Sequence, residues 1–316
     1  MSTMELQKTK PLFKYIGGKT WMRNHLREGV SSIIDNHHIT RYVEPFCGGL
    51  GAFFSVYDIL VKNGIKDIVL NDINHHLLTF YKAVNECPTT LLKDYMTLEQ
   101  AFESTIPLNI HSIDRKKDVE RYKLEMRNAE SFYKKIREQF NGNQFDGAMH
   151  GAHLLFLQKH CFNGIYRENS KGHHNVPFNW EYKSFKEDDI KQSIMNASQA
   201  FSHFSIQFTN CSFRDMEFQD TDLIYADPPY LNEKELNENK YSKGGFTLED
   251  QIALIGKLAS HCFLYSNHDN PLLIDALNVG NIEGELEILK LSRKNIISSS
   301  SESRKNDKIE ILVFKK

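Results

Sequence analysis

A glycine-rich loop, Phe-Cys-Gly-Gly-Leu-Gly at residues 46–51, sets the first limit on the fold of this chain. The apolar segment 41–45 predicts a strand that enters the loop, and residues 52–62 predict the helix that leaves it. Residues 66–71, with an Ile-Val-Leu run, predict a second, buried strand. Strand, glycine turn, helix and strand in this order form a βαβ unit with parallel strands. The sequence therefore predicts an α/β protein with a mixed, mainly parallel sheet.

The middle of the chain lacks this strand pattern. Residues 90–140 are rich in Lys, Arg and Glu with apolar residues at helical spacing, and residues 146–160 predict another helix before a polar loop at 162–183. Strand patterns return later, together with a helix at 248–259 that begins at a capping-box-like Thr-Leu-Glu-Asp. We expect one sheet, interrupted by a helical insert near residues 85–200. The later strands are expected at 204–209, 222–226, 262–266, 285–292 and 308–315.

The glycine loop and the end of the second strand together predict a cofactor site. Glycine lets the backbone approach a ligand where a Cβ would clash. Asp72 follows the second strand, and a carboxylate at this place accepts hydrogen bonds from ribose hydroxyls. The loop is not GxGxxG and the chain has no GxxxxGK[ST], which disfavours NAD and ATP. These residues indicate a nucleoside-type cofactor, with an ordinary glycine turn as the alternative.

A rigid turn, Asp227-Pro228-Pro229-Tyr230, follows the predicted strand 222–226. Proline fixes φ and has no N–H, so two prolines hold a turn at the carboxyl end of a strand, where α/β sheets bind ligands. The Asp227 carboxylate and the Pro228 carbonyl are two acceptors for the N–H bonds of an exocyclic amine. They would draw that nitrogen towards a tetrahedral shape and free its lone pair for in-line attack on a methyl group. An ordinary proline turn with a capping aspartate is the alternative.

Composition and charge limit the class of protein. The five cysteines are scattered without a CxxC pair and the histidines lack HExxH spacing, so we expect neither a disulfide framework nor a metal site. The chain has no apolar run of roughly 18 residues that would span a bilayer. Residues 1–10 lack the apolar core of a signal peptide, and we expect a cytoplasmic protein. The net charge of −2 neither indicates nor excludes DNA binding, because a local basic face suffices.

The Asp-Pro-Pro-Tyr turn and a series of other segments resemble the Dam family of DNA adenine-N6 methyltransferases. The order of these segments is the family's order, from an N-terminal cofactor motif through a DNA-reading segment to the catalytic turn, and they cover residues 11–315. The similar segments are Lys-Tyr-Ile-Gly-Gly-Lys (14–19), Phe-Cys-Gly-Gly (46–49), Asn-Asp (71–72), Phe-Asn-Gly-Ile-Tyr-Arg-Glu-Asn (162–169), Asn-Val-Pro-Phe (175–178), Ser-Asn-His-Asp (266–269) and Glu-Ile-Leu (310–312).

This resemblance implies a Rossmann-like methyltransferase fold and an enzyme that uses S-adenosylmethionine to methylate the N6 amino group of adenine in double-stranded DNA. Residues 1–84 and 201–316 would form the catalytic domain, and residues 85–200 the inserted target-recognition domain. The resemblance assigns the turn to the target adenine, which is flipped out of the duplex. The catalytic residues implied are Asp227, Pro228, Pro229 and Tyr230. The cofactor-binding residues implied are Tyr15, Lys19, Phe46, Cys47, Gly48, Asp72 and Asp227.

The resemblance also implies which residues contact DNA. Arg167 would read a guanine edge, the commonest specific contact, in a short palindromic site that contains GAT, such as GATC. Asn179 replaces a glycine that is frequent in the family, and Trp180 and Tyr182 flank the place where family members often carry an intercalating aromatic ring. The DNA-contacting residues implied are Lys14, Asn163, Gly164, Ile165, Arg167, Asn175, Pro177, Trp180, Arg293, Arg304 and Lys305. The last three of these would bind phosphates, which positions the protein without specifying the sequence.

Two other functions fit parts of the sequence. Related Asx-Pro-Pro-Tyr turns occur in methyltransferases that act on RNA or on protein amides, but the large insert at 85–200 favours DNA. A non-catalytic DNA-binding subunit of the same fold is disfavoured by the intact turn. We expect a monomer from a bacterium or phage, which acts alone or beside a companion restriction endonuclease.

Overall fold

The computed structural model describes residues 9–12, 14–15, 17–184, 186–230, 246–279, 282, 284–293 and 308–315. The chain divides into two compact units. The sheet unit comprises Lys19–Cys47, Ser55–Ile73 and His203–Lys316, and the helical unit comprises Met1–Gly18, Gly48–Phe54 and Asn74–Ser202. Within the described residues, none of the helices is long and apolar enough to cross a bilayer.

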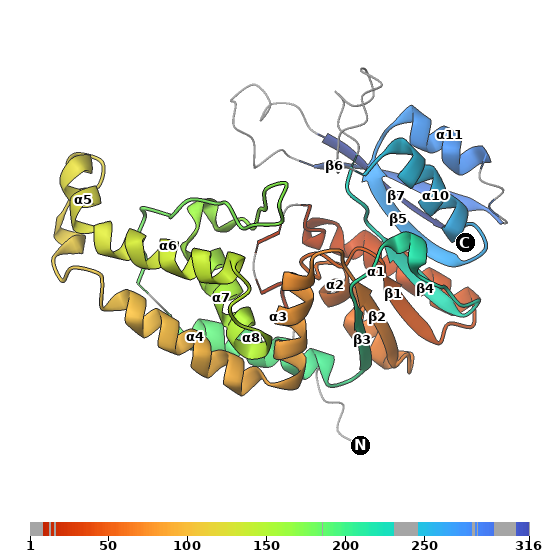
Figure 1. Cartoon of the computed structure of the whole chain (residues 1–316). Coiled ribbons are helices and arrows are strands. Elements are labelled where there is room, and N and C mark those ends of the chain that lie inside the picture. Colours follow the sequence, from red (N-terminus) through yellow and green to blue (C-terminus); the bar gives the residue numbers. More distant parts are fainter. Residues whose placement is uncertain are drawn as a thin grey trace. The chain divides into compact units, whose positions relative to one another are not determined.

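The sheet unit contains a mixed sheet in the order β3-β2-β1-β4-β5-β7-β6 (Figure 1). Neighbouring strands from β3 through β5 run parallel, whereas β7 is antiparallel to both β5 and β6. The predicted mixed, mainly parallel sheet is thereby confirmed. The described strands are β1 (Arg41–Glu44), β2 (Asp67–Asn71), β3 (Ser205–Thr209), β4 (Asp222–Ala226), β5 (Cys262–His268), β6 (Leu286–Arg293) and β7 (Lys308–Lys315).

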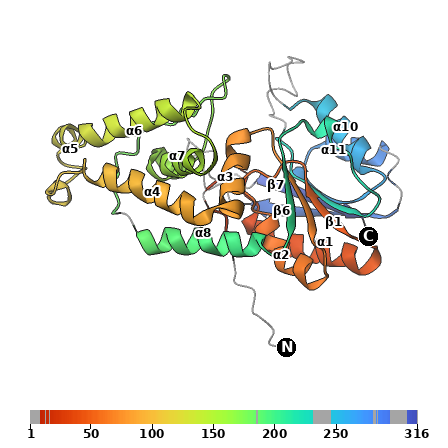
Figure 2. The ribbon, with the colours of Figure 1, turned by 60° about the horizontal axis from the view of Figure 1, so that its bottom comes forward.

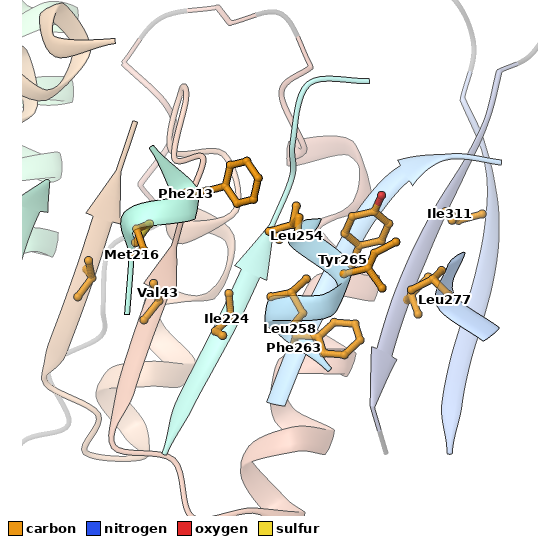
Figure 3. Close-up of a cluster of buried hydrophobic side chains, with 14 residues drawn as sticks. Val43, Phe213, Met216, Ile224, Leu254, Leu258, Phe263, Tyr265, Leu277 and Ile311 are labelled. Carbon is orange, nitrogen blue, oxygen red and sulfur yellow. The ribbon is translucent and has the colours of Figure 1, made fainter. Parts of the chain in front are cut away.

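Helices cover both faces of this sheet. Figure 3 shows α10 (Leu248–Leu258) and α11 (Pro271–Val279) on one face, where Leu254 and Leu258 pack with Phe263 of β5. The helix α1 (Arg23–Asn36) packs on the other face at Gly29, where an added Cβ would lie 2.7 Å from the Leu264 side chain. Successive residues of β5 thus face opposite layers, as the period of a strand requires. The short helices η1 (Thr20–Met22) and η4 (Phe213–Asp215) complete this unit, together with the part of α2 (Phe53–Lys62) that begins at Ser55.

The strand order places the two sequence motifs at one edge of the sheet. β1 and β4 are neighbours, with β2 and β3 on one side of the pair and β5 on the other. The order of the parallel strands therefore reverses between β1 and β4, and α/β sheets bind ligands at the carboxyl ends of strands at such a point. The loop that starts at Phe46 follows β1, and the turn that starts at Asp227 follows β4.

The helical unit is organised around α7 (Gly147–His160), which is buried along most of its length. A helix that is buried on all sides needs neighbouring elements all round it. Its neighbours include α3 (His75–Glu86), α4 (Pro88–Glu103) and α6 (Arg127–Asn141), and Figure 2 shows α7 among them. The other described helices of this unit are α5 (Val119–Glu125), α8 (Glu187–Phe201), η2 (Ile110–Ser112) and η3 (Phe162–Gly164).

The helical pattern predicted for the middle of the chain is present, because residues 119–160 contain α5, α6 and α7 and contribute no strand to the described sheet. The buried residues of α6 recur at helical spacing, from Ala129 through Tyr133 and Ile136 to Phe140. The predicted capping box is also present at α10. The Asp250 N–H donates to the Thr247 hydroxyl at 3.1 Å, and the Thr247 N–H donates back to the Asp250 carboxylate at 2.9 Å.

Candidate active site

The Asp227 carboxylate is held at both of its oxygens. The Ser266 hydroxyl, on β5, donates to Oδ1 at 2.8 Å, and the Lys19 ammonium lies 2.8 Å from Oδ2. The Tyr225 hydroxyl lies 3.0 Å from Ser266 Oγ and extends this chain of hydrogen bonds into the core. A carboxylate has about four lone-pair sites, so two such contacts orient it and leave capacity for further donors.

The buried Lys19 and Glu310 form a cluster with the half-buried Tyr230 beside Asp227. The Lys19 side chain is 3% exposed, and its Nζ lies 3.9 Å from Glu310 Oε2 and 4.8 Å from the centroid of the Tyr230 ring. The Tyr230 hydroxyl donates to Glu310 Oε2 at 3.1 Å. Burial, and then the charges of Asp227 and Glu310, raise the pKa of Tyr230 well above its ordinary value. The phenol therefore keeps its proton and remains a donor.

The two prolines of the turn have different surroundings. Pro228 is buried and Pro229 is exposed. The buried Gln251 of α10 donates to the Pro229 carbonyl at 2.9 Å, and its own carbonyl accepts from the Tyr265 hydroxyl at 2.8 Å. The turn is thus tied to α10 and β5. This bond occupies the Pro229 carbonyl and not that of Pro228, the second acceptor predicted from the sequence.

One buried asparagine ties together the loops that follow three strands. The Asn71 side-chain amide donates to the carbonyls of Pro45, at 2.9 Å, and Cys211, at 3.0 Å. Its Oδ1 accepts from the Thr209 hydroxyl at 2.9 Å. The Cys47 N–H donates to the Asn71 backbone carbonyl at 2.8 Å. These bonds fix the chain after β1, β2 and β3 at the edge where the cofactor site was predicted.

Asp72 lies directly after β2, and its side chain is mostly buried. Its backbone N–H donates to the Thr209 carbonyl at 3.3 Å, and the Asn210 side chain donates to the Asp72 carbonyl at 2.8 Å. The loop after β3 therefore fixes the backbone that carries this carboxylate. That position suits the predicted contact with ribose hydroxyls.

Phe46 and Cys47 are uncharged residues in the loop that follows β1. The Phe46 ring packs against Phe213 and Phe246, with centroids 5.6 and 5.5 Å apart. Burial, and then the negative charges of Asp72 and Glu44, raise the pKa of Cys47 well above its ordinary value. The thiol stays neutral, so it acts as a small apolar group and not as a nucleophile.

Tyr15 and Gly48 belong to the helical unit and lie together there. A Cβ at Gly48 would lie 3.1 Å from the Tyr15 ring, and one at Gly49 would lie 2.6 Å from Tyr15 Cβ. Gly48 also has φ +45°, which favours glycine. The Tyr81 hydroxyl donates to the Gly48 carbonyl at 2.8 Å. The glycines that the sequence marked are therefore needed for the close approach of a tyrosine side chain to the loop.

The residues predicted to read DNA form a small hairpin in the helical unit, here named the recognition hairpin (residues 161–178). Its two arms pair antiparallel at Cys161 with Phe178 and at Glu168 with His174. Asn163 and Gly164, in η3, both have positive φ, at 61° and 62°. The chain reverses sharply there, which accounts for the Asn-Gly pair in the motif.

Arg167 and Asn175 lie opposite each other on the exposed side of the recognition hairpin. Arg167 Nε donates to Asn175 Oδ1 at 3.2 Å, and the Asn175 N–H donates to the Arg167 carbonyl at 3.2 Å. Lys14 is exposed and forms an isolated parallel β-bridge with Ile165 of the hairpin. Pro177 is exposed as well. The structure thus brings together most of the predicted DNA-reading residues of this unit.

The aromatic residues near the hairpin differ in exposure. Trp180 is half-buried and packs on Phe178 with ring centroids 5.5 Å apart. The Tyr182 hydroxyl donates to Glu103. Phe162, in contrast, is 54% exposed beside Asn163. The resemblance points to the neighbourhood of Trp180 and Tyr182 for an intercalating ring, whereas the exposed ring of Phe162 lies in the recognition motif itself.

The predicted phosphate contacts lie near the C-terminus. Arg293 ends β6 and pairs with Lys308 of β7. Arg304 and Lys305 lie outside the described residues.

Two partners in the candidate site, Ser266 and Glu310, were not predicted from the sequence. Both residues lie in segments that resemble the family, 266–269 and 310–312, but the resemblance implies no role for either. A signal for Glu310 exists, because it is a carboxylate next to the apolar run Ile-Leu-Val-Phe at 311–314. Such a residue is expected to be paired when its strand is buried.

Comparison with known proteins gives a family match and similar proteins of comparable length. The model of the D12 class N6 adenine-specific DNA methyltransferases matches residues 15–287. The chain is 30% identical to Type II methyltransferase M.MjaIII of Methanocaldococcus jannaschii, over 96% of this chain and 98% of that protein. It is 26% identical to Type II methyltransferase M1.LlaDCHI of Lactococcus lactis subsp. cremoris, over 95% of each. It is 30% identical to a DNA adenine methylase of Vibrio cholerae, over 84% and 83%.

Proposed function

We propose that this chain methylates adenines in double-stranded DNA with S-adenosylmethionine as the methyl donor. The premise is that the chain belongs to the family of D12 class N6 adenine-specific DNA methyltransferases. The family match over residues 15–287 makes it an adenine-specific DNA methyltransferase. The cofactor, the target sequence, base flipping and the roles of single residues are the proposed parts.

The observation that carries the mechanism is the orientation of Asp227 at the end of β4. With Ser266 and Lys19 fixing its two oxygens, the carboxylate keeps lone pairs for an incoming amino group. In the proposed complex, Asp227 accepts one N–H of the adenine N6 amine and the Pro228 carbonyl accepts the other. These two bonds draw the nitrogen lone pair out of the ring system and aim it for in-line attack. The chemistry is then driven by positioning and by charge.

The residues of the sheet unit fit a nucleoside-type methyl donor. S-adenosylmethionine, when bound, would supply a methyl group from its positively charged sulfur, and breaking the sulfur–methyl bond would leave S-adenosylhomocysteine as the product. Asp72 would accept hydrogen bonds from its ribose hydroxyls, while Phe46 and the neutral Cys47 would line the pocket. Tyr15 and Gly48, in the helical unit, are proposed cofactor contacts on the resemblance.

The charges of the candidate site suit this transfer. Lys19 carries one positive charge, whereas Asp227 and Glu310 each carry a carboxylate. The cluster therefore holds one more negative charge than positive. Methyl transfer moves positive charge onto the N6 nitrogen, and a site with excess negative charge, fixed in place beforehand, stabilises that change.

We assign target recognition to the helical unit. Its recognition hairpin presents Arg167, supported by Asn175, on an exposed side. A guanidinium fork matches guanine O6 and N7 and discriminates against a wrong base by about 1–3 kcal/mol. The proposed target is a short palindrome containing GAT, with GATC as the first sequence to test. The target adenine leaves the duplex, because the acceptors of the turn reach its amino group only when the base is unstacked.

The proposed biological setting follows the relatives. Two of them are named Type II methyltransferases. We propose that this chain acts as a monomer on DNA, either alone or beside a companion restriction endonuclease.

The class of substrate is tested by methyl transfer from tritiated S-adenosylmethionine. Duplex DNA, single-stranded RNA and a protein mixture are offered in parallel, with the label counted on filters. We expect label on the duplex alone, and more on a duplex containing GATC than on one with the sequence permuted. Label on RNA or protein would favour the other acceptor classes, and the absence of label on all three would favour a non-catalytic subunit.

A further inference from the structure

Glu310 is a buried carboxylate in an apolar strand. It is 2% exposed, and the next four residues of β7 are apolar and buried. Its neighbours in register are His268 of β5 and Leu291 of β6. Burying a charge costs several kcal/mol unless partners compensate for the lost hydration. An aliphatic residue would suit the strand pattern better, so the reason for a carboxylate lies in what it contacts.

Glu310 contacts two groups of the candidate site. Glu310 Oε2 accepts from the Tyr230 hydroxyl at 3.1 Å and lies 3.9 Å from Lys19 Nζ. Lys19 in turn lies 2.8 Å from Asp227 and 4.8 Å from the Tyr230 ring centroid. Glu310 therefore interacts both with the phenol and with the ammonium of this cluster. It anchors the end of the aromatic ring and shares the ammonium that holds the acceptor carboxylate.

We propose that Glu310 is a positioning residue for methyl transfer, an inference that rests on the proposed function. Its bond to the Tyr230 hydroxyl fixes the plane of a ring that has two rotatable bonds. Its charge gives Lys19 a second counter-ion, so the ammonium draws less electron density from Asp227. Asp227 then stays the stronger acceptor for the adenine amine. Glu310 needs no contact with substrate or cofactor for either effect.

A purely structural role makes a different prediction. If Glu310 only completed the packing of β7, its replacement would lower the melting temperature and leave the methyl-transfer rate of the folded protein unchanged. A positioning role lowers kcat with little change in the affinities for DNA and cofactor, since the group acts on the transition state. The conservative Glu310→Gln, whose amide oxygen still accepts from Tyr230, would recover part of the rate.

The experiment compares the full chain with Glu310→Ala, Glu310→Gln and the matched control Glu285→Gln, an exposed carboxylate outside the cluster. Single-turnover methyl transfer to a duplex is measured beside the melting temperature, duplex affinity and S-adenosylmethionine affinity. We expect Glu310→Ala to lower the rate by about tenfold or more, Glu310→Gln to lower it less, and both affinities to stay within about threefold of the parent.

A double-mutant cycle with Tyr230→Phe tests the link between the two residues. Because the phenol is proposed to act through its bond to Glu310, losing both is expected to slow transfer by less than the product of the single effects. Equal rates for the parent and both Glu310 variants, or a loss confined to KM, would overturn the positioning role alone. A parent chain that transferred no methyl group to DNA would overturn the proposed function and this inference with it.

Discussion

Asp227 takes its orientation from residues far away in the sequence. Ser266 is 39 positions later in the chain, and Glu310, which shares Lys19 with Asp227, is 80 positions after Tyr230. The two prolines fix the backbone of the turn, but the side-chain hydrogen bonds fix the carboxylate. Each charge-assisted bond contributes about 1.5–3 kcal/mol. Their combined effect is to present the acceptor before substrate arrives.

A prediction for single residues concerns Asp72. Replacing it by alanine removes a charged acceptor from the proposed ribose contact, so Asp72→Ala is expected to weaken S-adenosylmethionine binding by about 1.5–3 kcal/mol. Isothermal titration calorimetry measures this directly. The melting temperature serves as the control for folding. An unchanged affinity in a folded variant would remove Asp72 from the cofactor site.

Arg167 carries the prediction on target choice. Arg167→Ala is expected to relax specificity at one base pair by about 1–3 kcal/mol and to leave cofactor affinity unchanged, because the arginine reads one guanine. The measurement is the methylation rate on oligonucleotides that each differ from the best site by one base pair. Arg304→Ala is the comparison, since a phosphate contact slows all sequences alike and its loss lessens the salt dependence. If Arg167→Ala slowed every oligonucleotide equally, its role would be positioning.

At the residue scale, the sequence predicted the groups that stand in short motifs and missed those that join them by tertiary contact. The turn at Asp227 follows β4 as expected, because proline geometry and a buried apolar strand are local features. Ser266 and Glu310 have no local signature of their partners. Their roles depend on which strands lie side by side, and that order appears only in the folded sheet.

Among the helices and strands, those with strong periodicity were predicted well. The strands after the insert lie within two residues of their expected bounds, and α7 covers 147–160 against a predicted 146–160. The helices α1 and α11 were not predicted. α1 contains Gly29, two serines and a Val, which are poor helix formers, and its position depends on Gly29 fitting against Leu264. Packing of this kind overrides local propensity.

The contact between α3 and α7 contains a pair of buried histidines. His76 Nδ1 and His150 Nε2 are 2.7 Å apart, which requires one protonated and one bare nitrogen. Burial lowers the pKa of His76 from 6.5 to about 3, and those of His150 and His174 to about 4. For His76 and His150, the charge of the nearby His75 is the second cause of this lowering of the pKa. All three rings are therefore neutral in the folded protein near neutral pH.

These depressed pKa values predict that stability falls in mild acid. The unfolded chain takes up protons at about pH 6.5, before the folded protein does, so the contribution of the neutral rings is complete above that pH and is lost as the pH falls towards about 4. Each extra proton bound by the unfolded chain lowers the free energy of unfolding by about 1.4 kcal/mol per pH unit. Urea titrations followed by circular dichroism between about pH 8 and pH 5 measure the slope.

Two variants test whether the buried histidines cause this pH dependence of the free energy of unfolding. His150→Gln removes one titrating group of the pair and is expected to flatten the dependence. His38→Asn, at an exposed position of the sheet unit, is expected to leave it unchanged. A free energy of unfolding that stays constant between about pH 8 and pH 5 would contradict this account of the histidines.

For the whole molecule, the proposed functions divide between the two units. The acceptor carboxylate, its partners and Asp72 lie in the sheet unit, while the recognition hairpin lies in the helical unit. The chain passes between the units at the glycine loop, since Cys47 belongs to one and Gly48 to the other. The net charge of −2 is the small difference between many positive and many negative side chains. We therefore expect DNA affinity to depend on local groups of basic residues and to fall steeply with salt concentration.

The central claim is that the Asp227 turn transfers a methyl group to adenine N6 in duplex DNA. The most direct test is mass spectrometry of the nucleosides released from a GATC duplex after incubation with S-adenosylmethionine, for the parent, Asp227→Ala and the exposed control Asp275→Ala. We predict N6-methyldeoxyadenosine with the parent and the control, and at least about a hundredfold less with Asp227→Ala, whose duplex affinity stays close to the parent's. A methylated cytosine as the product, or an Asp227→Ala rate equal to the parent's, would contradict the account.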